Sequence, residues 1–290
     1  MIKILKKIKN IIFKYLPDTI YLQYIYYRSV HMRLNLKNPQ TFNEKLQWLK
    51  LHDRNPLYTT MVDKYAVKKY VADKIGKEYI IPTLGVWNKF DDIDFDKLPN
   101  QFVLKTTHDS GGVVICKDKN NFSKQVAKEK ITKSLNNNFY NMWREWPYKN
   151  VPRKIIAEQY VQDKSSQELI DYKFYCFNGV PKFLYVSQGM SNHSTAKLSF
   201  LNMDWTFAPF YRTDYKQFDT LPSKPILFEK MCNIVKTLAK NIPFVRVDLY
   251  EINKQIYFSE LTFFPGAGYA LFCPNEWNKK IGDWLILPKK

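Results

Sequence analysis

A lysine that ends an apolar run and precedes a glycine-containing turn is the clearest chemical pattern in this sequence. Residues 101–112 read QFVLKTTHDSGG, and the run FVL predicts a strand that ends at Lys105. The backbone N–H groups of a loop with Ser110, Gly111 and Gly112 can surround phosphate oxygens, whose charge an ammonium group neutralises. The loop matches neither the Walker pattern nor GxGxxG. It therefore indicates either another class of phosphate-binding loop or an ordinary turn beside an exposed lysine.

Two acidic residues near the C-terminus form a second candidate set. Residues 244–251 (FVRVDLYE) and 256–262 (IYFSELT) both predict strands, and their short connection predicts a hairpin. With a three-residue loop, Asp248 and Glu260 are diagonal neighbours roughly 5–8 Å apart on one face, whereas a two-residue loop separates them to opposite faces. Carboxylates on a mostly apolar hairpin need a cation, and Arg246 and Mg²⁺ are both suitable. The residues alone leave both alternatives open.

The order of these residues resembles the nucleotide-binding pattern of the ATP-grasp superfamily. The matching positions are Lys64, Lys105, Gly111, Gly112, Glu158, Asp248 and Glu260. More specifically, residues 39–71 (PQTFNEKLQWLKLHDRNPLYTTMVDKYAVKKYV), 171–179 (DYKFYCFNG) and 259–268 (SELTFFPGAG) resemble the teichuronopeptide-biosynthesis (TupA-like) branch. The resemblance covers about residues 35–290, and the long first motif is its most specific part.

This resemblance implies an α+β protein with the ATP-grasp fold, in which two lobes with antiparallel sheets clasp a nucleotide. It places an N-terminal helical segment at residues 1–60 and a catalytic unit at residues 61–290, with a lid lobe at about 87–157. Proteins of this branch are often labelled glycosyltransferases because they are associated with surface-polysaccharide synthesis. The implied fold is instead that of a ligase.

The resemblance also implies ATP and Mg²⁺ as cofactors. The expected nucleotide contacts are Lys64, Lys105, Ser110, Gly111, Gly112, Glu158, Tyr160, Val161 and Asp171. Lys105 would contact the phosphates, and Lys64, expected on a helix, would be the second nucleotide lysine. Glu158 would lie at the hinge that contacts adenine, together with Tyr160 and Val161. Asp171 would bind the ribose.

A smaller set would act on the transferred phosphoryl group. Lys173 would meet the γ-phosphate or an acyl phosphate, and Arg246 would stabilise the charge that develops during transfer. Asp248 and Glu260 would hold the metal. Thr262 stands where many ATP-grasp enzymes have a metal-binding asparagine, which is a departure from the pattern.

The implied reaction is the activation of a carboxylate. The γ-phosphoryl group passes to the carboxylate, an amine attacks the acyl phosphate, and phosphate leaves as the amide forms. By family analogy the carboxylate belongs to a uronic acid of a capsular or cell-wall glycan, or to its sugar-nucleotide precursor. The amine would be an amino acid or a small amino alcohol. Two alternatives remain: a glycosyltransferase that uses a sugar nucleotide, since Asp92, Asp94 and Asp96 form Asp-x-Asp pairs, and a non-catalytic membrane-associated scaffold.

The composition indicates the cellular compartment of the protein and the classes of partner that it binds. The four cysteines are scattered without CxxC spacing, as expected for a cytoplasmic protein. The net charge of +18 indicates an anionic partner, and the absence of a recognised nucleic-acid motif argues against nucleic acid. Residues 1–16 are lysine-rich, contain no acid and carry apolar residues at helical spacing. This basic amphipathic helix would either pack on the core or make peripheral contact with the inner face of the cytoplasmic membrane.

Mixed strands and helices must position these side chains. Thr41 and Glu44 predict a capping box that opens a helix, and residues 63–75 predict a second helix that ends at Gly76. Further helices are expected at residues 122–136 and 226–239, and strands at residues 82–87, 102–105, 112–116, 155–161, 172–177 and 183–187.

Overall fold

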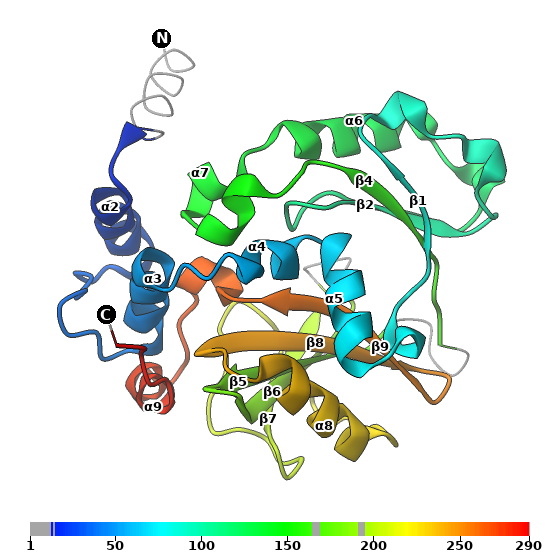
Figure 1. The fold of residues 1–290 in the computed structure, drawn as a ribbon. Helices are drawn as coiled ribbons and strands as arrows, with labels where there is room; N and C mark the ends of the chain where they lie inside the picture. Colours follow the sequence, from blue (N-terminus) through cyan, green and yellow to red (C-terminus); the bar gives the residue numbers. More distant parts are fainter. Residues whose placement is uncertain (1–12, 14, 164–168, 191–194, 290) are drawn as a thin grey trace.

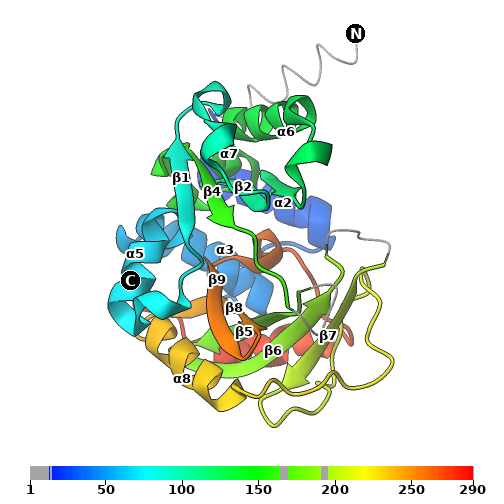
Figure 2. The same cartoon turned by 90° about the vertical axis from the view of Figure 1, so that its right-hand side faces the viewer.

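Two antiparallel sheets, each covered by helices, make up the computed structural model of this chain (Figures 1 and 2). The structure describes residues 13, 15–163, 169–190 and 195–289. The α+β fold class expected from the sequence is confirmed. The basic amphipathic helix expected at residues 1–16 lies almost entirely outside the described residues.

The smaller lobe is built on a four-stranded sheet in the order β1-β4-β2-β3. Its strands are β1 (Thr83–Trp87), β2 (Phe102–Thr106), β3 (Val113–Cys116) and β4 (Ile155–Gln159). Strand β2 alternates buried and half-buried side chains because helix α6 (Lys124–Asn136) packs against one face. The hairpin predicted around the glycine loop is confirmed, with Lys105 paired to Val113.

The larger lobe is built on a five-stranded sheet in the order β7-β6-β5-β8-β9. Its strands are β5 (Asp171–Phe177), β6 (Val180–Gln188), β7 (Lys197–Asn202), β8 (Phe244–Ile252) and β9 (Gln255–Thr262). Helix α8 (Phe228–Ala239) packs on β5, β6 and β8. Phe42 packs against Phe177 in a tilted arrangement and against Phe244 edge-on, and the central strand β5 is buried almost throughout. The β5–β6 hairpin turns at Asn178 and Gly179, both at positive φ, as their sequence predicts.

The remaining helices lie beside and between the sheets. They are α2 (Asp18–Val30), α3 (Phe42–His52), α4 (Leu57–Val62), α5 (Ala66–Ile75), α7 (Phe139–Trp143) and α9 (Glu276–Trp284), with short 3₁₀ turns η1 (Lys77–Tyr79), η2 (Phe90–Asp92), η3 (Phe95–Lys97), η4 (Lys119–Asn121), η5 (Trp146–Asn150) and η6 (Pro265–Gly268). The predicted capping box is present, since Thr41 and Glu44 exchange side-chain and backbone hydrogen bonds at the start of α3.

The expected placement of Lys64 on a helix is wrong. The Asp63 side chain accepts hydrogen bonds from the backbone N–H groups of Tyr65 and Ala66, at 2.8 and 3.2 Å, so α5 starts at Ala66. Lys64 therefore lies in the turn between α4 and α5.

The β8–β9 hairpin differs from the prediction in its turn and its register. Its loop has two residues, Asn253 and Lys254, both at positive φ, rather than three. An irregularity beside Asp248 leaves Ser259 without a partner in the ladder, and this bulge shifts the pairing by one residue. Asp248 is consequently directly opposite Glu260, not diagonal to it. The two carboxylates still share a face, because the bulge offsets the shorter loop.

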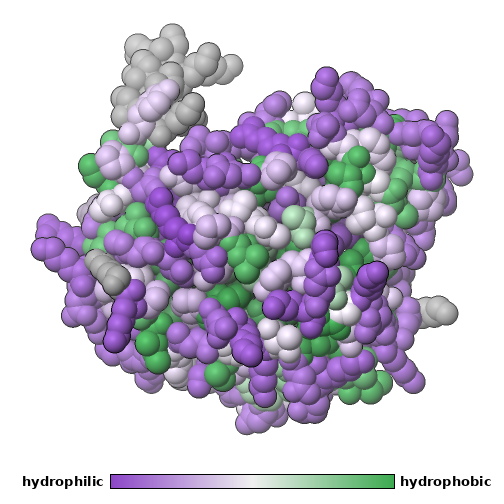
Figure 3. Space-filling view, viewed as in Figure 1, coloured by the Kyte–Doolittle hydropathy of each residue, from purple (hydrophilic) through white to green (hydrophobic). Residues whose placement is uncertain are grey.

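The first described helix is attached to the smaller lobe. Tyr21 on α2 donates to the carbonyl of Met142 at 2.9 Å, and Tyr140 donates to Asp18 at 2.8 Å. Arg144 pairs with Asp18 at 3.1 Å. Within the described ranges, every helix is too short or too polar to span a bilayer. On the face drawn in Figure 3, hydrophobic side chains are scattered in small groups among hydrophilic ones.

Candidate active site

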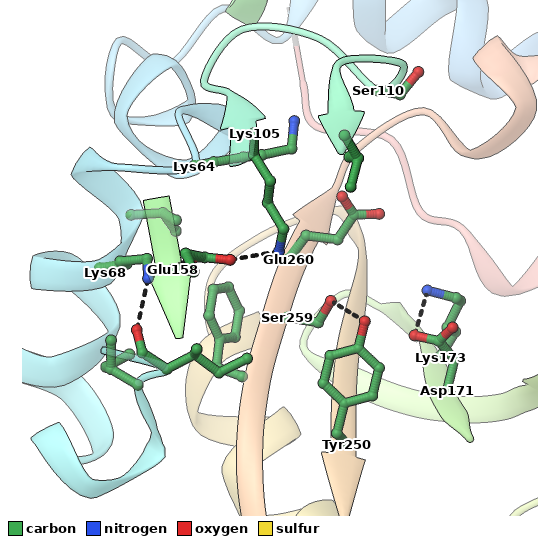
Figure 4. A pocket seen from close by; sticks show the side chains of 15 residues that line it. Lys64, Lys68, Lys105, Ser110, Glu158, Asp171, Lys173, Tyr250, Ser259 and Glu260 are labelled. Carbon is green, nitrogen blue, oxygen red and sulfur yellow. Dashed lines mark hydrogen bonds and ion pairs between the residues drawn. The ribbon is translucent and has the colours of Figure 1, made fainter. Parts of the chain in front are cut away.

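A cavity of about 250 Å³ lies between the two sheets, and four lysine side chains converge on it (Figure 4). They come from four elements and are Lys64 in the α4–α5 turn, Lys68 on α5, Lys105 on β2 and Lys173 on β5. Ser110, Glu158, Asp171 and Glu260 also line this lysine cavity. Most of the polar residues predicted from the sequence are therefore brought together.

Glu158 holds two of these lysines. Its carboxylate accepts from Lys68 and Lys105 at 2.5 Å each. Burial alone would raise the pKa of Glu158, but the two ammonium groups outweigh burial and lower it. Lys68 was not among the predicted site residues, although its spacing of four from Lys64 is a usable signal. Tyr160 and Val161 follow β4 and are not among the described residues that line the lysine cavity.

The loop between β2 and β3 is organised by Asp109. Its carboxylate accepts hydrogen bonds from the hydroxyl groups of Thr106 and Ser134 and, at 3.2 Å, from the backbone N–H of Gly112. Lys64 donates to the Asp109 carbonyl, which ties the α4–α5 turn to this loop. The sequence prediction passed over Asp109, and an acid inside a candidate phosphate loop was the available signal.

The two loop glycines have different structural roles. A Cβ atom on Gly112 would overlap the hydroxyl oxygens of Thr106 and Ser134, so this position requires glycine for close packing. A Cβ atom on Gly111 would meet nothing within 4 Å. Gly111 and Ser110 are exposed, and they leave the loop backbone open to a ligand.

A buried ionic network lies beneath the lysine cavity. Arg246 donates to Asp248 through Nε at 2.7 Å and through Nη2 at 2.6 Å, and Nη2 also reaches Glu260 at 2.9 Å. Lys173 donates to Asp248 at 2.8 Å and to Asp171 at 3.1 Å. Arg246 thus lies between the two hairpin carboxylates and contacts both of them.

The pKa values of this network reflect burial opposed by close charges. Burial raises the pKa of Asp248, and Arg246 and Lys173 offset only part of this effect. Burial would also raise the pKa of Glu260, but Arg246, Lys173 and Lys64 outweigh it and lower the pKa to about 2. Glu260 is thus held as a carboxylate at the cavity wall.

The carboxylates of this site suit a magnesium ion that takes one ligand, Glu260, from the protein. Among the described residues, no group of three or more His, Cys, Asp or Glu side chains could hold a metal by itself. Both oxygens of Asp248 already accept from cations. Glu260 lines the cavity with 39% of its side chain exposed, and Arg246 and Thr262 both contact its Oε1 atom. Mg²⁺ is usually bound by one or two carboxylates together with phosphate oxygens and water, so this donor set suits it.

A second cavity, of about 410 Å³, adjoins the first. Ser110 and Glu260 line both cavities, so they lie at the boundary. The second cavity is largely aromatic, and we call it the aromatic cavity; its rings belong to Phe139, Trp143, Tyr148, Phe264 and Tyr269. Arg246, Asp109 and Glu145 also line it. Its residues come from distant parts of the chain. Only Arg246, Glu260 and Ser110 were predicted as site residues from the sequence, and Thr262 was noted there as a departure from the family pattern.

The acidic segment considered for a glycosyltransferase lies elsewhere. Asp92 and Asp94 are exposed on the smaller lobe, and Asp94 pairs with Lys97 at 3.0 Å. Neither residue lines the lysine cavity or the aromatic cavity.

The comparison with protein families agrees with the resemblance seen in the sequence. The family described as TupA-like ATP-grasp matches residues 44–286. No curated protein matches the chain. Among solved structures, a D-alanine–D-alanine ligase from Helicobacter pylori is 16% identical, covers 85% of this chain and 69% of its own, and has a TM-score of 0.46. The corresponding Bacillus anthracis ligase is 17% identical at 70% and 57% coverage, with a TM-score of 0.39. The ATP-grasp ligase PsnB, solved with a precursor variant, Mg and ADP, is 8% identical at 84% and 65% coverage, with a TM-score of 0.44. This chain thus spans 57% of the length of the B. anthracis ligase and 65% of PsnB.

Proposed function

This chain belongs to the TupA-like ATP-grasp family, and we propose that it is an ATP-dependent carboxylate–amine ligase. It would form an amide on a uronic acid during capsular or cell-wall polysaccharide biosynthesis, through an acyl phosphate. The observation that carries the proposal is a single cavity lined by four lysines and by Glu260, which Arg246 contacts from the adjoining cavity. Such a site can neutralise phosphate charge, and phosphoryl transfer depends mainly on positioning and charge neutralisation.

The lysines would bind the polyphosphate of ATP. Lys105 has 24% of its side chain exposed, and in the structure its ammonium group is held by Glu158. Phosphate oxygens can replace this carboxylate as its partner, because both are anionic acceptors. Lys64 is held against the carbonyl of Asp109 beside the glycine loop, where the loop amides can reach the same phosphates.

Arg246 and Lys173 would stabilise phosphoryl transfer. Both are fixed by Asp248 on one side and approach the boundary between the two cavities, so little reorganisation is needed when negative charge develops. Glu260, with Asp248 behind it, would hold Mg²⁺, whose chemical contribution is to neutralise charge on the phosphate oxygens. Thr262 donates to Glu260 at 3.2 Å and so orients that carboxylate.

The proposed substrates are a uronic acid, in a glycan or a sugar nucleotide, and a small amine. The net charge of +18 supports an acidic glycan as the partner, and nucleic acid is not part of the proposal. We place the protein in the cytoplasm. We also propose peripheral contact with the membrane through residues 1–16, a segment that lies almost entirely outside the described residues.

Thermal unfolding in the presence of nucleotides tests this proposal. A ligand that binds only the folded state raises stability by about 2.7 kcal/mol at 100 times its Kd. We expect Mg-ATP to raise the Tm of the wild-type protein and of Lys97→Ala, which changes an exposed lysine of the same lobe. Lys105→Ala should lose the shift. An equal shift with Mg-ATP in Lys105→Ala would contradict the proposal. A shift with UDP-sugars alone would also contradict it, and would favour glycosyl transfer.

A further inference from the structure

The aromatic cavity is in the right place for the second substrate of the proposed ligase. It adjoins the lysine cavity at Ser110 and Glu260, so a molecule inside it would reach the phosphate end of the nucleotide site. Its volume of about 410 Å³ lies within the range of small-molecule sites. Ser29, exposed on α2, lines it as well, so the N-terminal part of the chain helps to form the cavity.

The charges of the two cavities differ in sign. The first cavity is lined by four lysines and by three acids, Glu158, Asp171 and Glu260, so its cations are in excess. Arg246 is the one basic side chain among the described residues that line the second, and its guanidinium is already held by Asp248 and Glu260. Glu145 and Glu260 contribute carboxyl groups to the same wall. An anionic ligand is therefore favoured in the lysine cavity, and a cationic one in the aromatic cavity.

The protein itself places an ammonium group against the wall of the aromatic cavity. Nζ of Lys50 lies 4.9 Å from the ring centre of Tyr269 and 5.6 Å from that of Phe264, and both rings line the cavity. Nζ donates to the carbonyls of Trp143 and Ala267, at 2.9 and 2.8 Å. The faces of aromatic rings attract cations, and these rings present aromatic surface to the cavity as well.

We propose that the aromatic cavity binds the amine substrate as a cation, and that it selects amines without a carboxylate, such as amino alcohols, over amino acids. The inference rests on the proposed ligase function. Glu145, buried at the cavity wall, would face the ammonium group of the amine substrate, and the rings would enclose the rest of that substrate. The carboxylate of an amino acid would meet the carboxyl groups of Asp109, Glu145 and Glu260. The nearby cations Arg246 and Lys50 are already held by protein acceptors, which disfavours binding of an amino acid.

Saturation-transfer NMR with ethanolamine and glycine tests the proposal. The two probes are similar in size, and glycine alone has a carboxylate. We expect ethanolamine to receive saturation from the wild-type protein and glycine to receive little. Glu145→Gln keeps the shape of the side chain and removes its charge, and should weaken ethanolamine binding about tenfold, as expected for the loss of one charge-assisted hydrogen bond. Equal binding of glycine and ethanolamine would overturn the proposal.

A second variant covers the case in which Glu145→Gln does not fold. Ser29→Arg adds a positive charge and bulk at the cavity mouth from an exposed helix position, and should also weaken ethanolamine binding. Tyr27→Arg adds the same charge to an exposed position of the same helix outside the cavity lining, and should bind like the wild type. Unchanged binding in Ser29→Arg would overturn the proposal.

Measurements at the nucleotide site distinguish a failure of the amine assignment from a failure of the proposed ligase function. Lys105→Ala should lose the thermal shift with Mg-ATP and retain the ethanolamine signal. If the wild type shows the ATP shift without ethanolamine binding, the amine assignment alone is wrong. If ethanolamine binds without any ATP shift, the ligase function is wrong.

Discussion

Replacing Gly112 with alanine should disrupt the loop that faces the nucleotide. The added Cβ atom would overlap the hydroxyl oxygens of Thr106 and Ser134, which both donate to the buried carboxylate of Asp109. Neither oxygen can move away without losing its hydrogen bond to that carboxylate. Gly111 is the matched control, because a Cβ atom there would meet nothing within 4 Å.

The magnitude follows from two contributions. Overpacking a filled site costs about 1–3 kcal/mol. Loss of a hydrogen bond to a charged group costs about 1.5–3 kcal/mol. We therefore expect Gly112→Ala to lower the free energy of unfolding by about 2.5–6 kcal/mol, which corresponds to a fall in Tm of roughly 4–10 °C for a chain of this size. Gly111→Ala should stay within about 0.5 kcal/mol of the wild type.

Thermal unfolding of both variants, with and without Mg-ATP, measures these effects. Gly112→Ala should unfold at a lower temperature and show a smaller shift with Mg-ATP, because the loop amides are displaced. Gly111→Ala should match the wild type in stability. Equal Tm values for the two variants would refute the reasoning, since it depends on the close contacts of Gly112 alone.

Further predictions concern the charged groups of the site. Asp248→Asn should lower stability by about 3–5 kcal/mol in urea unfolding, because it leaves Arg246 and Lys173 buried without their shared carboxylate; an effect as small as that of Glu260→Gln would contradict this. Glu260→Gln, at a side chain 39% exposed, should cost at most about 1 kcal/mol yet weaken Mg-dependent ATP binding, measured by the Tm shift. The lowered pKa of Glu158 contributes stability that is present above its ordinary pKa of 4.5 and is lost as the pH falls through the lower folded value. Urea unfolding between pH 6 and pH 3 should therefore show a smaller loss in Glu158→Gln than in the wild type. Chelation of divalent ions with EDTA should reduce the Tm shift produced by ATP; an undiminished shift would argue against a metal-bridged complex.

Local signals in the sequence were sufficient for much of the fold. The turn at Asn178 and Gly179 has the residue types that a two-residue hairpin needs, and the capping box at Thr41 and Glu44 depends only on residues three apart. The strand that ends at Lys105 is marked by its apolar run and by the glycines that follow. These features depend on neighbours in the chain, so composition and spacing are enough to find them.

Features that depend on tertiary contacts were predicted less well. The bulge at Ser259 cannot be read from strand composition, and it reverses the consequence of the shorter β8–β9 loop. Lys64 lies in a turn because of hydrogen bonds to Asp63, which compete with the helical pattern of the same residues. The role of Asp109 depends on Ser134, which comes from helix α6.

The substrate side of the site was the least predictable part. The aromatic cavity brings Ser29 and Glu145 together with Phe264 and Tyr269, which are far apart in the chain. Apart from Phe264, which lies in the motif at residues 259–268, none of these positions carries a local motif, and a buried aromatic residue is ordinarily part of a hydrophobic core. Only the fold reveals that these rings line an open volume beside Glu260.

Trapping of an acyl phosphate tests the central claim most directly. Purified protein would be incubated with Mg-ATP, a uronic acid and hydroxylamine, and the hydroxamate and ADP would be measured. The ligase function predicts that hydroxamate forms in proportion to ADP, that omission of the uronic acid abolishes it, and that Arg246→Met, which removes the guanidinium at the cavity boundary, reduces it at least about a hundredfold, as expected for the loss of one preorganised charge-stabilising group. ADP release without hydroxamate, or the same yield with Arg246→Met, would contradict the account.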